Sequence, residues 1–249
     1  MPVDDVADFN RAIVEATADA VCAYKPNLAF YEALGIPGLK ALEQTVAAIR
    51  QYAPTAMIIG DAKRGDIGPS AQAYAKAMFQ VWDFDAVTIN AWGGADTVEP
   101  FLTDAERGVF IWCRGSNPGS SDLQDLTIES SAGRVPLYQH LAQDSLIWNG
   151  KRNVGLVVGA TFPEQLSQVR KICPDMPFLI PGVGAQGGDL ESAIQQGTDS
   201  HGRLAIINSS RGIIYASSGP DFAQAARRET LKLRDAINQV LEAMGKGWP

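Results

Sequence analysis

An apolar run passes directly into a cluster of charges at residues 56–66, where the chain reads Ala-Met-Ile-Ile-Gly-Asp-Ala-Lys-Arg-Gly-Asp. A short apolar run bounded by charge is typical of a strand that is buried on both faces, as in a parallel sheet. Pro69 and Ser70 follow closely and suit the first turn of a helix. This order predicts one βα unit with charged side chains at the carboxyl end of its strand.

The same order recurs along the chain. Short apolar runs rich in Val, Ile and Ala alternate with longer segments of helical period. Seven strands are predicted, at residues 20–24, 56–60, 86–90, 109–113, 154–159, 178–180 and 204–208, and helices at 39–52, 70–81, 137–148, 163–172 and 221–244. No Pro- or Ser-rich linker interrupts the repetition, so we expect a single domain over residues 1–249.

Two α/β architectures compete for this pattern, the doubly wound sheet and the (β/α)₈ TIM barrel. No Gly-x-Gly-x-x-Gly sequence follows the first predicted strand, which argues against a dinucleotide-binding sheet. Polar and Gly-rich segments instead follow almost every strand, which favours a barrel with its site at the strands' carboxyl ends. Residues 4–17 have the pattern of an amphipathic helix, so we expect a TIM barrel whose first strand is absent from this chain.

Composition narrows the class of protein. Of the 249 residues 46% are hydrophobic and 20% charged, which is typical of a folded domain. A formal net charge of −7 gives no general attraction to nucleic acid or to an anionic membrane, and no apolar run approaches the ~18 residues of a membrane helix. The acidic start lacks a secretion signal. Three widely spaced cysteines predict buried, reduced thiols in a cytoplasmic protein, and two histidines leave little for a metal centre.

The charged cluster has a possible chemistry. In an extended chain residues two apart point the same way, so Asp61 and Lys63 would project together into the barrel mouth, with Asp66 nearby in a short loop. Lys25 follows a neighbouring strand. An alternating array of these four side chains would keep both carboxylates ionised and present Lys63 as a proton donor. The alternative is a surface salt-bridge cluster with Lys25 extended to solvent.

Three further loops carry polar or glycine-rich sequences. Residues 181–188, Pro-Gly-Val-Gly-Ala-Gln-Gly-Gly, and residues 208–212, Asn-Ser-Ser-Arg-Gly, follow the last two predicted strands. Barrel enzymes frequently bind phosphate in the loops after strands 7 and 8, so a phosphate site is predicted there. Residues 114–119, Arg-Gly-Ser-Asn-Pro-Gly, could bind a planar polar ring or form an ordinary turn.

The ordered set of motifs resembles the orotidine 5′-monophosphate decarboxylase family, in particular its longer-chain bacterial subgroup. The set comprises Asp61-x-Lys63-x-x-Asp66, Lys25-Pro-Asn27 upstream of it, Ser-Asn-Pro-Gly at 116–119, and the two Gly-containing segments near the end of the chain. The resemblance runs from about residue 8 to residue 215.

The resemblance implies a TIM-barrel enzyme that decarboxylates orotidine 5′-monophosphate to uridine 5′-monophosphate in pyrimidine biosynthesis, without a cofactor or metal. Asp61 would lie against the substrate carboxylate, and Lys63 would stabilise and then protonate the C6 carbanion. Lys25 would bridge Asp61 and the ribose. Asp66 would reach into the neighbouring subunit's site, with Ser70 on the same shared loop, so a homodimer is expected.

The resemblance also assigns the groups that would bind the rest of the substrate. Ser116 would recognise the pyrimidine, and Asn27 and Ser70 match further substrate-binding positions. The phosphate would be held by Gln186, Arg211, Gly212 and Gly184.

This chain departs from the family's pattern at its start. Family members begin with a strand whose aspartate binds the ribose, and neither Asp4 nor Asp5 follows such a strand here. Loss of the strand would open the barrel between its first and last strands. Two alternative functions therefore stay open, a magnesium-dependent sugar-phosphate lyase of the same superfamily and a catalytically inactive nucleotide-binding homologue.

Overall fold

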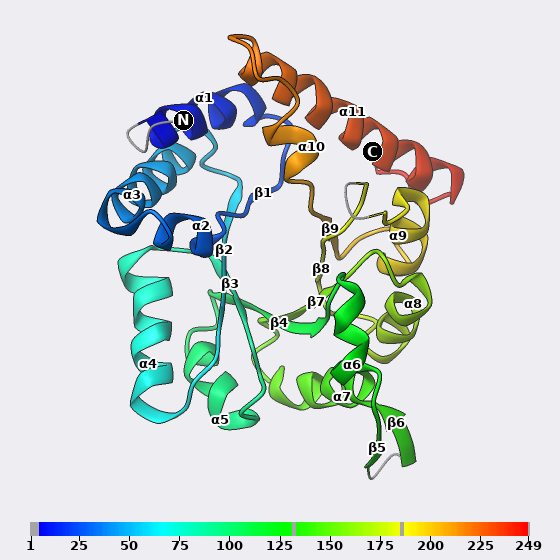
Figure 1. The fold of residues 1–249 in the computed structure, drawn as a ribbon. Helices are drawn as coiled ribbons and strands as arrows, with labels where there is room; N and C mark the ends of the chain where they lie inside the picture. The colour runs from blue at the N-terminus through cyan, green and yellow to red at the C-terminus, as the bar shows by residue number, and fades with distance from the viewer. Residues whose placement is uncertain (1–4, 131–132, 185–186, 249) are drawn as a thin grey trace.

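Seven parallel strands form one curled sheet in the computed structural model, which describes residues 5–130, 133–184 and 187–248. Helices surround the sheet on its outer side (Figure 1). The strand order is β1-β2-β3-β4-β7-β8-β9, so each strand pairs with the next of the set along the chain. The bounds are β1 Ala23–Tyr24, β2 Met57–Arg64, β3 Ala86–Ile89, β4 Gly108–Arg114, β7 Val154–Val158, β8 Phe178–Ile180 and β9 Ala205–Ile207. All seven predicted strands are confirmed, and β2 continues four residues beyond its predicted end at Gly60.

The helices follow the predicted repetition. Their bounds are α1 Asp5–Thr17, α2 Leu28–Glu32, α3 Gly35–Tyr52, α4 Gly68–Lys76, α5 Ala95–Val98, α6 Ser121–Gln124, α7 Leu137–Trp148, α8 Pro163–Ile172, α9 Leu190–Gly197, α10 Arg211–Ile214 and α11 Phe222–Ala243. The predicted helix 70–81 combines α4 with a π-helical turn, Ala77–Val81. In the described residues no helix is both long and apolar enough to cross a membrane.

A hairpin that the sequence reasoning missed projects from the body of the protein (Figure 1). Its strands β5, Thr127–Ser130, and β6, Gly133–Pro136, pair antiparallel with each other and join none of the seven parallel strands. Both strands are only four residues long and polar on one face, so they produce no apolar run of the kind used to find the other strands.

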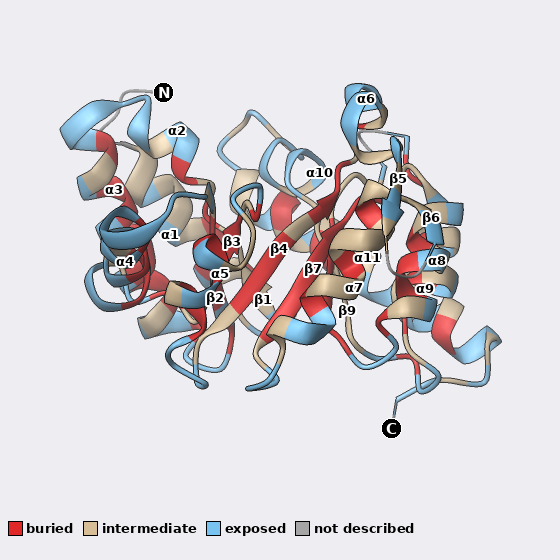
Figure 2. Ribbon diagram, turned by 90° about the horizontal axis from the view of Figure 1, so that it is seen from below, coloured by how far each residue is buried: buried red, intermediate tan, exposed pale blue. Residues whose placement is uncertain are grey.

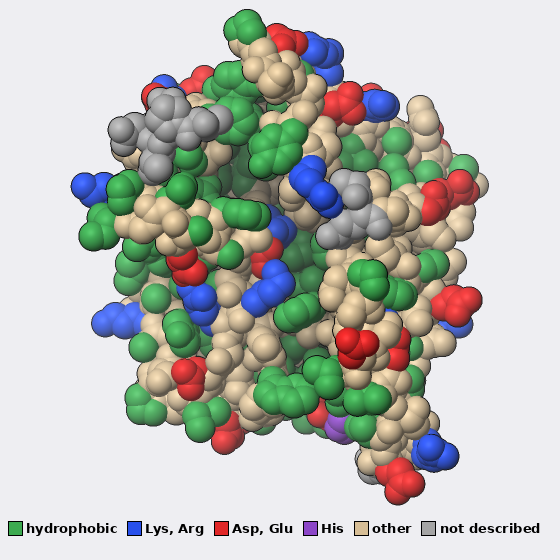
Figure 3. All heavy atoms as spheres, in the orientation of Figure 1, with side chains coloured by type: hydrophobic (Ala, Val, Ile, Leu, Met, Phe, Trp, Pro, Cys, Tyr) green, Lys and Arg blue, Asp and Glu red, His purple; other side chains and the backbone are tan. Residues whose placement is uncertain are grey.

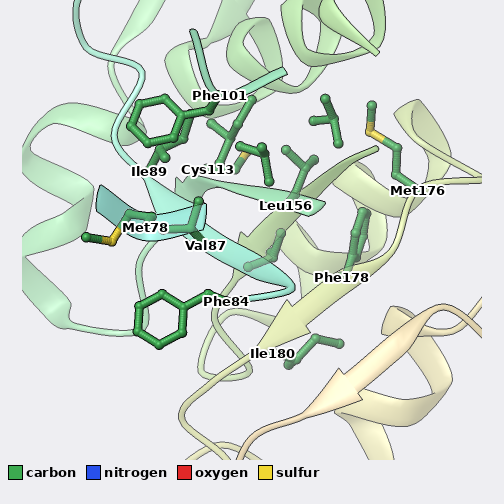
Figure 4. Packing of buried hydrophobic residues seen from close by; sticks show 14 of the residues in the cluster. Met78, Phe84, Val87, Ile89, Phe101, Cys113, Leu156, Met176, Phe178 and Ile180 are labelled. Carbon is green, nitrogen blue, oxygen red and sulfur yellow. The ribbon is translucent and has the colours of Figure 1, made fainter. Parts of the chain in front are cut away.

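The core has two layers, one on each face of the sheet. The inner layer consists of Ile59, Ala86, Phe110, Val157 and Leu179, one from each of five successive strands. The larger outer layer fills the space between sheet and helices, and Figure 4 shows part of it. Strands β4 and β7 are buried by both layers, whereas the helices expose their outer faces (Figure 2). Alternate residues of each strand therefore serve different layers, as the two-residue period of a strand requires.

The sheet is open between its two end strands, β1 and β9. Outside this opening the helical layer is closed, because α1 packs on α11 and the rings of Phe9 and Phe222 stack with centroids 4.8 Å apart. Beneath these helices lies a largely apolar cleft of about 430 Å³, lined by residues of α1, β1, β9 and α11. Ala23 and Ile206, which extend the inner layer to the edges of the opening, are only half-buried. The described residues thus supply seven strands to the parallel sheet, and the opening lies between β1 and β9 as expected.

Candidate active site

Asp61 lies at the carboxyl end of β2 between two lysines. The Lys25 ammonium donates to its Oδ2 at 2.6 Å, and the Lys63 ammonium donates to its Oδ1 at 2.5 Å. The backbone N–H of Asp61 donates to the carbonyl of Pro26 at 2.9 Å, which aligns the segment after β1 with the end of β2. Three of the four members of the predicted array therefore meet at the barrel mouth.

The environment keeps the Asp61 carboxyl ionised. Its side chain is only 8% exposed, and burial by itself would raise its pKa. The ammonium groups of Lys25 and Lys63 outweigh this effect, so the pKa of Asp61 lies below its ordinary value. The ionised carboxylate in turn holds both ammonium groups in place by charge-assisted hydrogen bonds.

The side chains of Asp61 and Lys63 meet for a different reason from the one the sequence suggested. Regular extension was expected, but Lys63 has a φ of +43°, and the pairing of β2 with β3 shifts between Gly60 and Arg64. Thr88 of β3 holds this bulge, because its Oγ1 accepts from the N–H groups of Ala62 and Lys63 at 3.1 and 3.0 Å.

The same Thr88 hydroxyl donates to Oδ1 of Asp61 at 2.9 Å, so it fixes the carboxylate as well as the bulge. Sequence reasoning missed this residue. Threonine is common in buried strands, and only the register of β3 against β2 places this one beside Asp61.

Asp66 does not join the array within one chain. It lies in the exposed loop between β2 and α4, where its Oδ1 accepts from the N–H of Ile67 at 2.8 Å. Among the described ion pairs of this chain, Asp61 is paired with Lys25 and Lys63, and Asp66 takes part in none. The four-membered array predicted for a single chain is wrong in this respect. Ser70 lies on the first turn of α4 and is also exposed.

The two segments predicted to bind phosphate converge on one cavity. It has a volume of about 340 Å³ and is lined by residues 181–184 on one side and 208–213 on the other. Gly182 and Gly184 have φ angles of +98° and +71°, which an L-residue adopts only with strain. Arg211 and Gly212 begin α10 at the same cavity. Gln186 lies outside the described residues.

The loop after β4 lies over the same mouth. An ideal Cβ on Gly115 would be 3.5 Å from Nε1 of Trp112, and the ring of Trp112 is 5.9 Å from Nζ of Lys63. The loop that carries Ser116 therefore begins near Trp112, whose ring faces Lys63. Figure 3 shows this face of the molecule hollowed at its centre, with acidic and basic side chains around the hollow. Asn27 caps α2, accepting from the N–H of Ala29 at 3.2 Å, next to Lys25.

Among the described residues no group of three or more His, Cys, Asp or Glu could hold an ion. Cys113 and Cys173 are buried thiols as expected, and burial raises the pKa of Cys173 to about 12. Cys22 is exposed, contrary to the expectation of a buried thiol, because it borders the opening between β1 and β9.

Comparison with known proteins gives consistent results. The sequence profile of the "Orotidine 5'-phosphate decarboxylase / HUMPS family" matches residues 3–228. A Roseiflexus sp. (strain RS-1) protein named orotidine 5'-phosphate decarboxylase is 50% identical over 98% of this chain and 89% of its own length. A Cellvibrio japonicus protein of the same name is 49% identical over 92% of this chain and 82% of its own.

Solved structures show the same similarity in three dimensions. The structure of Leishmania donovani OMP decarboxylase superposes with a TM-score of 0.84 at 34% identity, covering 94% of this chain and 87% of that one. The structure of Leishmania donovani UMP synthase superposes with a TM-score of 0.85 at 36% identity. The aligned region covers 94% of this chain and 50% of that one. These neighbours confirm the TIM-barrel prediction.

Proposed function

The chain belongs to the orotidine 5′-phosphate decarboxylase family, and from that membership we propose that it converts orotidine 5′-monophosphate into uridine 5′-monophosphate and carbon dioxide. The observation that carries this proposal is the Lys25–Asp61–Lys63 cluster at the barrel mouth. A decarboxylation that leaves charge on carbon needs a fixed cation at that carbon, and the cluster provides one. The reaction belongs to pyrimidine nucleotide biosynthesis.

The chemical step uses Asp61 and Lys63. The bond between C6 and the carboxylate breaks, carbon dioxide leaves, and the electron pair stays on C6. Lys63 stabilises that pair through its positive charge and then donates a proton from Nζ to C6. Its side chain is 39% exposed, so solvent can restore the proton after each turnover. Asp61 lies beside the substrate carboxylate, and the repulsion between the two anions is relieved when carbon dioxide leaves.

Binding of the remaining substrate uses the loops around the mouth. The cavity between residues 181–184 and 208–213 accepts the phosphate, with Arg211 as a bidentate donor. Ser116 contacts the pyrimidine, and Lys25 with Asn27 faces the ribose. Contacts to the phosphate, remote from C6, supply binding energy that orients the reacting end.

A second copy of the chain completes the site. Four large apolar side chains are highly exposed on the segments that follow the adjacent strands β1, β2 and β3, namely Phe30 at 73%, Ile36 at 72%, Ile67 at 60% and Trp92 at 75%. Exposed apolar side chains gathered on one face are typical of a surface that another protein covers. A symmetric dimer through this face would bring Asp66 to the partner's Lys–Asp–Lys cluster.

Mixing variants tests the shared site. Lys63→Ala and Asp66→Ala chains are each expected to be inactive, but a mixed dimer contains one site with both residues. Random pairing should restore about a quarter of the wild-type activity. Failure of the mixture to gain activity, with mixed dimers shown to form, would contradict the shared site.

Turnover itself is tested by following the ultraviolet absorbance of orotidine 5′-monophosphate, with and without EDTA. Turnover that survives EDTA is expected. Turnover that EDTA abolishes would indicate a magnesium-dependent lyase, and tight binding of uridine 5′-monophosphate without turnover would indicate an inactive homologue. The three free thiols fit a reducing compartment, so we place the reaction in the cytoplasm.

A further inference from the structure

Arg114, the last residue of β4, is a charged side chain with 0% exposure. Its guanidinium donates to the segment that follows it in the chain. Nη2 donates to the Ser121 hydroxyl and to the Asp125 carboxylate, both at 3.0 Å. Nη1 donates to the Ser120 hydroxyl and, at 3.3 Å, to the Gln124 side chain. The buried guanidinium of Arg114 thus forms hydrogen bonds that fix the conformation of residues 115–125.

This arrangement depends on the shape of the guanidinium. Cζ of Arg114 lies 4.0 Å from the ring centroid of Phe162, so one face of the guanidinium packs on an aromatic ring while Nη1 and Nη2 donate to the loop. Nε is buried and has no hydrogen-bond partner among the described residues. Burying a charge is expensive, and an apolar side chain of similar volume would often stabilise the fold equally well. A planar fork with five donors, however, specifies the positions of several acceptors at once. Arg114 therefore contributes by fixing the conformation of the loop, an effect that an apolar side chain could not provide.

The loop that contains Ser116 also forms hydrogen bonds on its other side, with residues just after β7. The Thr161 hydroxyl donates to the carbonyl of Ser116 at 2.8 Å, and the N–H of Gly159 donates to the carbonyl of Arg114 at 2.9 Å. A Cβ at position 159 would lie 2.6 Å from Cα of Ser116, so only glycine permits this close approach. Ser116 is thereby held between the Arg114 network and the end of β7.

The loop that carries Ser116 begins beside a side chain of the active site. Gln124 accepts from the N–H of Gly115 at 2.8 Å, which fixes the start of the loop near Trp112. Trp112 in turn faces the ammonium of Lys63, 5.9 Å from its ring centroid. The Arg114 network therefore fixes the start of this loop relative to Trp112, the side chain that faces Lys63.

We propose that Arg114 is a positioning residue for base recognition, holding residues 115–121 so that Ser116 meets the pyrimidine beside Lys63. This inference rests on the proposed function. It predicts that Arg114 affects binding of the base and has little effect on binding of the phosphate, whose cavity is formed by other loops.

The test compares two ligands that differ in the base. Uridine 5′-monophosphate and ribose 5-phosphate are titrated by calorimetry into the wild type, Arg114→Met and the milder Gln124→Ala. For Arg114→Met we expect about tenfold weaker binding of the nucleotide, the equivalent of one hydrogen bond, and less than about twofold for ribose 5-phosphate. Gln124→Ala should change the same ratio in the same direction. In turnover, KM for orotidine 5′-monophosphate should rise more than kcat falls.

Arg170→Met is the matched control. Arg170 is also buried, but its donors reach only backbone carbonyls near the amino ends of the strands, including those of Gly197, Met176 and Leu204. This variant should melt at a lower temperature without changing the ratio of the two affinities.

Equal weakening of both ligands by Arg114→Met, or an unchanged ratio in Gln124→Ala if the first variant does not fold, would overturn the inference alone. A wild type that binds no uridine 5′-monophosphate would overturn the proposed function together with it.

Discussion

Asp61, near the carboxyl end of β2, and Asp85, just before the first residue of the adjacent strand β3, lie at opposite ends of the barrel, and each is flanked by two cationic side chains. At the carboxyl end, Asp61 accepts from Lys25 and Lys63. At the amino end, Asp85 accepts from both terminal nitrogens of Arg50 at 2.9 Å. A second arginine approaches it to 3.8 Å, and the N–H of Ile58 donates to it at 2.7 Å. Burial by itself would raise the pKa of each carboxyl, but the flanking cations and hydrogen-bond donors lower it by more, so each pKa lies below its ordinary value.

The two clusters differ in the kind of cation. A guanidinium stays protonated at any physiological pH and occupies both oxygens of a carboxylate, so the Asp85 cluster can only hold β2 and β3 together. An ammonium is a point charge that can give up a proton to a substrate. Similar charge patterns thus stabilise the fold at the amino end of the barrel and support chemistry at its carboxyl end. Variants at the two ends should therefore affect different quantities, stability at one and turnover at the other.

The largest effect is expected for Lys63→Ala. It removes both the cation at C6 and the proton donor, so kcat should fall at least about 10⁴-fold. Asp61 keeps its pairing with Lys25, and the melting temperature should change little. Steady-state kinetics and thermal melting measure both quantities. Arg107→Ala, which removes a cation from the Asp85 cluster, is the control and should leave kcat unchanged.

A smaller loss is expected for Arg211→Ala at the phosphate cavity. Loss of a charge-assisted bidentate contact of about 3 kcal/mol should lower kcat/KM by about 10²-fold. The change should appear in both kcat and KM, because phosphate binding also orients the reacting end. Arg211→Lys should recover part of the loss, since it restores the charge without the fork. Kinetics that match the wild type in Arg211→Ala would place the phosphate elsewhere.

At the opposite end, Asp85→Ala should reduce stability without changing the chemistry. It leaves the N–H of Ile58 without its acceptor and removes two hydrogen bonds from Arg50, which keeps its contact with the Asp83 carbonyl. The free energy of unfolding should fall by about 2 kcal/mol. The kcat of the folded variant should stay within about threefold of the wild type, as expected for a residue outside the site. Urea unfolding and kinetics on one preparation give both numbers. A large fall in kcat in a fully folded Asp85→Ala variant would contradict a purely stabilising role for the Asp85 cluster.

The smallest effect concerns acid stability. Because the folded-state pKa of Asp85 is below its unfolded value of about 3.9, its ionisation stabilises the protein above that pH. The contribution is lost as the pH falls through the lower, folded-state pKa. Asp85→Asn should therefore flatten the decline of unfolding free energy below about pH 5, measured in urea at several pH values. An identical decline in the variant would show that Asp85 contributes nothing to it.

The strands were predicted more successfully than the details of the site. Buried parallel strands are continuous apolar runs, and such runs can be recognised locally. The bulge at Lys63 and the role of Thr88 could not be found this way, because both depend on the register of β3 against β2. The β5–β6 hairpin was missed because it lacks an apolar run.

The site itself was predictable as a set of residues and not as a geometry. The spacing of Asp61 and Lys63 indicated a shared direction, and the structure brings them to 2.5 Å through a bulge instead of an extended strand. The short loop before Pro69 was expected to hold Asp66 near the mouth, whereas Asp66 takes no part in the described ion pairs of Asp61 within one chain. A loop's path depends on contacts that its own residues do not encode.

By itself the sequence determined the class of fold, the positions of the seven strands and the family, because these depend on residue types repeated at local spacings. Tertiary structure decided which charged clusters can act. Asp61 and Asp85 are both aspartates near the ends of buried strands, and only the folded sheet brings lysines to one and arginines to the other. The physical reason is that charge and hydrogen bonding act over a few ångströms in space. Residues 36 positions apart, such as Lys25 and Asp61, acquire that proximity only when the barrel forms.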